Sequence, residues 1–111
     1  MLKFLINIEL TGVTFIRGYI QFLFEGAVLN TYTLPQIKTE NKEFTFIQCG
    51  YYDKLCSLIG KHILSVYEGE DRIVIQFENN MKLVVSLNLE DRRCAEAAML
   101  QIERDGKWET W

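Results

Sequence analysis

GYYDKLCSLIG, residues 50–60, is the segment of this chain with the clearest helical period. Leu55, Leu58 and Ile59 recur at spacings of three and four residues, which places them on one face of a helix. Asp53 suits the N-cap position, and Gly60 suits the C-terminal cap. The pattern predicts a linking helix over residues 53–59. Because so short a helix is marginal by itself, we expect it to pack against the rest of the fold.

The sequence on either side of this helix is dominated by strand patterns. Two segments alternate apolar and polar residues with a period of two: Ile20, Phe22 and Phe24 in the first, and Ile73, Ile75 and Phe77 in the second. This period predicts strands with one buried face. Pro35, the only proline, ends the first group of strands because it cannot donate to a ladder. We interpret residues 36–42 as a surface loop, and residues 43–49 as either a strand or an irregular segment.

The two halves of the chain can be aligned with one another, which indicates an internal duplication. The predicted pseudo-repeat covers residues 10–35 and 58–89. Its alignment pairs residues 10–12 with residues 58–60, the Ile20 group with the Ile73 group, and Leu29 with Leu83. Each half therefore reads as a meander of three antiparallel strands.

The last segment, residues 98–111, reads as a C-terminal hairpin with Asp105-Gly106 in its turn. Together these patterns predict a single domain over residues 1–111 with an α+β, mainly β fold. Two duplicated antiparallel β-meanders would pack as a sandwich or a partly open barrel, joined by one short helix.

Composition and charge exclude several classes of function. The chain has 111 residues, of which 24% are charged, and its formal net charge is -3. No basic stripe is available to neutralise phosphates, so we expect no nucleic-acid partner. Asn7 and Glu9 interrupt the apolar N-terminal run, and no segment is long enough to span a membrane. We therefore expect a cytoplasmic protein without a membrane partner.

Cys49, Cys56 and Cys94 match no zinc-binding spacing and include no CxxC pair. We expect no metal and no cofactor, and we interpret the three thiols as reduced and mostly buried. A nucleophilic cysteine assisted by His62 would need a third, orienting group and a lowered thiol pKa.

The polar residues that could support catalysis are Asp53, His62, Asp91, Arg92 and Glu96. Each also has a structural explanation: Asp53 as a helix cap, His62 as a hydrogen-bonded strand residue, and Asp91 and Arg92 as anchors of a loop. No phosphate-binding glycine loop, HExxH or GxSxG motif is present. The alternative function is thus a small-ligand-binding or minor enzymatic role centred on His62 with Asp53 or Asp91.

Aromatic residues favour binding instead. Tyr and Trp are enriched at interface hot spots, and the chain has more of them than one small core needs: Tyr19, Tyr32, Tyr51, Tyr52, Trp108 and Trp111. An open sheet edge could also pair with a second copy to make a homodimer.

The chain resembles a small bacterial protein family whose members combine three motifs. These are GYxDxLCxLIG at residues 50–60, EDR at residues 90–92 followed by EAA at residues 96–98, and a terminal WxxW at Trp108 and Trp111. Ala95 departs from the pattern, where proline is expected. The resemblance covers mainly the second half and implies a fold type without a known activity. In size and acidity the chain is also similar to the immunity proteins of bacterial toxin systems.

The function predicted from sequence is therefore a non-enzymatic protein-interaction module of the immunity-protein kind. Its partner would be another protein or a second copy of the chain. The predicted binding residues are Tyr51, Tyr52, Asp91, Arg92, Glu96, Trp108 and Trp111.

Overall fold

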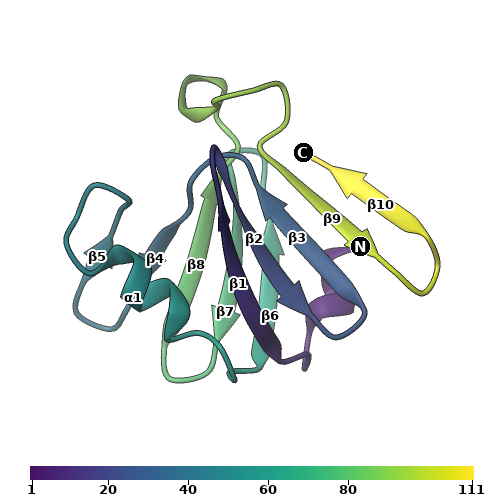
Figure 1. The fold of residues 1–111 in the computed structure, drawn as a ribbon, viewed down its shortest axis with the longest axis horizontal. Helices are drawn as coiled ribbons and strands as arrows, with labels where there is room; N and C mark the ends of the chain where they lie inside the picture. The colour runs from purple at the N-terminus through teal and green to yellow at the C-terminus, as the bar shows by residue number, and fades with distance from the viewer.

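The strands form two stacked five-stranded antiparallel sheets in a computed structural model that describes residues 1–111 (Figure 1). The first sheet has the order β1-β2-β3-β9-β10, with β1 at Leu10–Ile16, β2 at Tyr19–Phe24, β3 at Ala27–Thr31, β9 at Ala98–Ile102 and β10 at Lys107–Thr110. The second has the order β5-β4-β8-β7-β6, with β5 at Glu43–Phe44, β4 at Gln36–Lys38, β8 at Met81–Ser86, β7 at Arg72–Phe77 and β6 at Ile63–Glu68. The helices are the short 3-10 turns η1 (Leu2–Leu5) and η2 (Leu89–Asp91) and one α-helix, α1 (Tyr51–Cys56). The predicted mainly β fold is confirmed, and it is an open sandwich rather than a barrel because each sheet keeps two edge strands.

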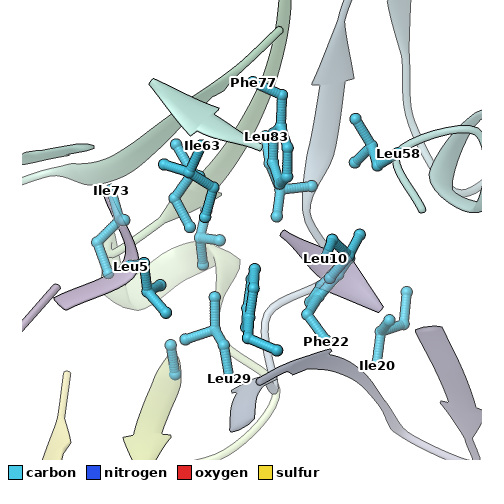
Figure 2. Packing of buried hydrophobic residues seen from close by; sticks show 14 of the residues in the cluster. Leu5, Leu10, Ile20, Phe22, Leu29, Leu58, Ile63, Ile73, Phe77 and Leu83 are labelled. Carbon is cyan, nitrogen blue, oxygen red and sulfur yellow. The ribbon is translucent and has the colours of Figure 1, made fainter. Parts of the chain in front are cut away.

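The inner faces of the two sheets share one core of 25 buried residues. In Figure 2, Phe22 and Leu29 of the first sheet lie across from Leu83 and Phe77 of the second. All four are inaccessible to solvent. Burial of each such side chain stabilises the fold by roughly 1.5 to 3 kcal/mol. Since both meanders supply it, the core needs both halves of the chain.

The two meanders match one another in detail. The alternating groups that begin at Ile20 and at Ile73 both occupy the central strand of a meander and face the core. Both first strands carry a register shift, between Leu10 and Gly12 in β1 and between Ile63 and Ser65 in β6. The shift follows Leu10, which pairs with Phe24, in β1, and Ile63, which pairs with Phe77, in β6. Leu10 therefore corresponds to Ile63.

The start of the predicted repeat alignment was wrong. Residues 10–12 were aligned with residues 58–60, but the offset that relates Leu10 to Ile63 aligns Asn7 with Gly60. Both of these residues have a positive φ, 69° at Asn7 and 91° at Gly60. The physical reason for the error is that the register is set by the bulge and by this left-handed residue, neither of which alternation of apolar residues reveals.

Each half exchanges a hairpin with the other. After β3 the chain leaves the first sheet, and the β4-β5 hairpin pairs with β8 of the second sheet. After β8 the chain returns, and the β9-β10 hairpin pairs with β3. The interpretation of residues 36–42 as a loop was therefore wrong over β4, whose three residues are too few to show a period. Of residues 43–49, only β5 is a strand.

The helix begins earlier than predicted and ends earlier too. It covers Tyr51–Cys56 instead of residues 53–59, and Gly50, with a φ of 89°, occupies the N-cap. Asp53 lies inside the helix and does not cap it. The start is displaced because Tyr51 is anchored to a distant segment, with its hydroxyl donating to the carbonyl of Pro35. The helix contacts β1 of one sheet and β4 of the other.

We predict that Gly60→Ala lowers the free energy of unfolding by about 1 to 2 kcal/mol, because the left-handed conformation is strained for a residue with a Cβ. Gly60→Asn should cost less, since asparagine tolerates this conformation and occupies the matching position at Asn7. Urea denaturation of both variants measures the difference. Equal losses for alanine and asparagine would contradict the assignment of strain to this residue.

Candidate functional site

Of the two tyrosines predicted to bind a partner, only Tyr52 offers an exposed surface. Tyr51 is 1% exposed, and its hydroxyl donates to the Pro35 carbonyl at 2.6 Å. Burial raises the pKa of Tyr51 well above its ordinary value, and the adjacent Tyr52 adds to the rise. Tyr52 is exposed and stands edge-on to Phe15, with ring centroids 5.0 Å apart. Tyr51 therefore connects the helix to the crossover segment.

The two tryptophans differ in the same way. Trp108 lies on the edge strand β10 and is 65% exposed, the most exposed aromatic ring in the chain. Trp111 packs against the core, and its indole N–H donates to Glu68 at 2.9 Å. Trp108 is thus the tryptophan available to a partner.

The predicted residues between β8 and β9 hold their own loop in shape. The guanidinium of Arg92 donates to the carbonyls of Leu87 and Ala95, at 3.0 and 2.8 Å. The carboxylate of Asp91 accepts from the Ser86 hydroxyl at 2.5 Å. These bonds agree with the structural explanation of both residues as loop anchors. Asp91 also borders a cavity on the outer side of the second sheet.

The remaining polar candidates are exposed. Glu96 contributes only its backbone carbonyl, which accepts from the thiol of Cys94. Cys49, Cys56 and Cys94 are all exposed and unpaired, so the interpretation of the cysteines as mostly buried was wrong. Cys56 lies on the outward side of α1, while Cys49 and Cys94 lie in irregular segments that the core does not reach.

His62 belongs to a different cluster. It lies between two carboxylates, with Nδ1 3.3 Å from Glu78 and Nε2 3.8 Å from Glu9. The backbone N–H of His62 donates to the Glu78 carboxylate and lowers the pKa of Glu78, and the contact with the imidazole ring lowers it further. All three side chains are about half exposed.

The structure does not bring His62 and Asp91 together. His62 precedes β6, next to the Phe77 end of β7, whereas Asp91 bonds to Ser86 beside the Arg72 end. At about 3.4 Å per residue, the length of β7 separates them by roughly 17 Å. Figure 1 shows the corresponding connections at opposite ends of the sheets. Asp53 is exposed on α1 and is not a partner of the His62 ring.

The outer face of the first sheet carries no charged side chain. Strand pairing places these residues on it: Gly12, Thr14, Ile16, Tyr19, Gln21, Leu23, Val28, Asn30, Met99, Gln101, Trp108 and Thr110. We call this surface the uncharged face. Its central row runs from Leu23 through Val28 and Gln101 to Trp108. The amides of Gln21 and Asn30 bond to one another across it.

The outer face of the second sheet is different in kind. The equivalent positions include Lys38, Glu43, Arg72 and Lys82. An uncharged face is unusual in a chain with 24% charged residues, and its absence from the duplicate sheet makes it a specific property of the first. Sequence reasoning named Tyr19 and Trp108 as candidate interface aromatics but missed the face itself. The uncharged side of β2 was visible in the alternation of Tyr19, Gln21 and Leu23.

Comparison of the chain with protein-family models, with curated proteins and with solved structures gives no match. The resemblance to a small bacterial family therefore remains an expectation from three sequence motifs. None of the helices is long and apolar enough to cross a membrane. No three histidine, cysteine or acidic side chains come together as metal ligands.

We predict that Tyr51→Phe costs about 1 to 3 kcal/mol at neutral pH, because the buried Pro35 carbonyl loses its donor. The raised pKa of Tyr51 adds a pH dependence: its stabilising contribution is complete below about pH 10, the unfolded value, and is lost as the pH rises. The difference from the unsubstituted protein should therefore shrink above pH 10 in urea denaturation. Tyr52→Phe, at the exposed neighbour, removes no hydrogen bond to the Pro35 carbonyl and should cost little at neutral pH.

The lowered pKa of Glu78 gives a prediction on the acid side. Its contribution to stability is present above the unfolded pKa of about 4.5 and is lost as the pH falls through the folded value. Glu78→Gln should therefore make the acid limb of the stability curve shallower. Glu25→Gln, on the matching turn of the first half, is the control, and an identical effect in both variants would contradict the role of His62.

Proposed function

We propose that the protein is a cytoplasmic, non-enzymatic protein-interaction module, and that the uncharged face is its docking surface. The single observation that carries the proposal is the absence of charge across all five strands of that face. Interface centres are depleted in charged residues and enriched in Tyr, Trp and Met. Tyr19, Met99 and Trp108 supply these types on the face.

The partner that best suits the uncharged face is a second copy of the chain. A twofold interface brings identical patches together, so any charge near the axis would meet its own copy. The uncharged face avoids that repulsion, whereas Lys38 and Lys82 on the other sheet would create it. Face-to-face packing of two sheets with interdigitating side chains is a common arrangement.

The size of the face supports a reversible association. Four spacings between five strands give a width of roughly 20 Å, and a strand of six residues is about 20 Å long. The face is therefore smaller in projection than the ~800 Å² per partner of a standard interface. We expect a dimer that forms and dissociates with concentration, with the exposed ring of Trp108 near its margin.

The alternative, a ligand-binding or enzymatic role centred on His62, has less support. Asp91 lies at the opposite end of β7, and Asp53 makes no contact with the ring. The partners of His62 are instead Glu9 and Glu78, next to the bridge that joins the two halves. A structural role accounts for this cluster.

Sedimentation equilibrium tests the proposal. We predict a monomer–dimer equilibrium that Gln101→Glu weakens at least about tenfold, because it places two like charges close together on the uncharged face. Gln101 is exposed, so this variant should keep its fold. Ser65→Glu introduces the same charge on the exposed outer side of β6 and should leave the equilibrium unchanged.

A monomer at all accessible concentrations would contradict self-association through the uncharged face. So would a dimer that Gln101→Glu leaves intact, or one that both variants weaken equally. The chain could instead be monomeric and capture a different protein. If Gln101→Glu abolishes that capture, the uncharged face is still the docking surface, but its partner is the different protein.

A further inference from the structure

A cavity lies on the outer side of the second sheet, away from the uncharged face. Its volume is about 640 Å³, within the range of roughly 300 to 1,000 Å³ of small-molecule sites. Its floor is formed by the crossover into β4 and by the ends of β7 and β8, and its walls are the loop after β8 and the segment after β5. Only three of its twelve lining residues are apolar: Leu34, Phe46 and Val84.

Two charged groups of the cavity, Asp91 and Arg93, form no ion pair with one another. Asp91 is held by the Ser86 hydroxyl, which occupies one oxygen of the carboxylate and leaves the other without a partner. Arg93 has no ion pair and no side-chain hydrogen bond, although it lies two residues away in the same lining. Unlike charges this close in sequence could pair directly, but Asp91 and Arg93 do not. The Asp91 carboxylate is therefore free to bind a cation, and the Arg93 guanidinium is free to bind an anion.

A buried hydroxyl adds a third unsatisfied group. Thr33 lies in the cavity lining and is 4% exposed, and its Oγ1 has no hydrogen-bond partner. A buried polar group without a partner costs about 1 to 3 kcal/mol. Val84 and Phe46 stand beside these polar groups and can cover the apolar part of a ligand.

We propose that this cavity binds a small zwitterion, an amino acid or a short peptide, whose carboxylate contacts Arg93 and whose ammonium group contacts Asp91. Two carboxylates and two guanidiniums line the cavity, with Asp71 and Arg72 forming a loose pair at 3.6 Å. A polyanion such as a phosphate ester would meet the carboxylates, and a metal ion would lack a third ligand. A ligand with one charge of each sign satisfies both free groups.

Titration followed by amide NMR shifts tests the proposal with five probes. These are alanine, trialanine, N-acetyl-trialanine, trialanine amide, and N-acetyl-trialanine amide. Alanine or trialanine should shift the signals of Thr33 and of residues 86–93. Removing either charge by capping should weaken binding at least about tenfold, and the neutral probe should not bind. The ratio of alanine to trialanine affinity distinguishes a free amino acid from a peptide.

Variants localise the binding. Arg93→Gln and Asp91→Asn should each weaken the zwitterion about tenfold or more. Asn can still accept from Ser86, and Arg93 makes no contact that the fold needs, so both variants should fold. Arg104→Gln and Asp105→Asn, at the distant β9-β10 turn, are matched controls and should bind normally. Thr33→Val should stabilise the free protein, because it removes a buried hydroxyl without a partner.

Several results would overturn the proposal. One is the absence of cavity shifts with either zwitterion at millimolar concentration. Another is equal binding of the zwitterion and a singly charged probe, which would make the cavity a simple anion or cation site. Equal losses in the cavity variants and the controls would also exclude it. None of these outcomes bears on self-association, because the uncharged face lies on the other sheet.

Discussion

The two sheets are joined at one end by a short ladder of backbone hydrogen bonds, and the duplicated fold depends on it. The N–H of Asn7 donates to the carbonyl of Ile63 at 2.7 Å, and the N–H of Gly60 donates to that of Leu10 at 2.8 Å. Each bond is the twofold counterpart of the other, because Asn7 matches Gly60 and Leu10 matches Ile63. The left-handed residues turn each chain segment into the ladder, and the bulges then direct β1 and β6 into separate sheets. His62 lies within this ladder, which explains why its polar neighbours serve the architecture.

Local patterns predicted the long strands, and non-local contacts decided what the sequence could not show. Alternation located the central strand of each meander because one of its faces is buried. The start of α1 depends on the bond from Tyr51 to Pro35, which joins segments far apart in the sequence. Individual aromatics such as Trp108 were identifiable as candidates. The uncharged face could not be identified from the sequence, because it forms only when β9 lies beside β3. No local period indicates this pairing of distant segments.

The duplicated sheets keep the same inner packing and differ on their outer sides. Core positions tolerate only apolar residues of suitable volume, so both halves retain them. Outer positions carry no such constraint, and here the outer face of one sheet has no charged side chain while that of the other carries lysines and a cavity lined by Asp91 and Arg93. The divergence gives one small fold two chemically distinct surfaces. Neither surface disturbs the other, because the shared core separates them.

The exchange of hairpins also determines when the protein can finish folding during synthesis. Ala27 of β3 pairs with Ile102 of β9, so the first sheet lacks two of its five strands until residues 98–110 are made. A ribosome delivers the N-terminal meander first, with one long side of its sheet unpaired. The strands of the second sheet all lie between residues 36 and 86, so that sheet can form earlier. Completion of the first sheet by β9 and β10 is then the late step, and it has the slow kinetics of long-range strand pairing.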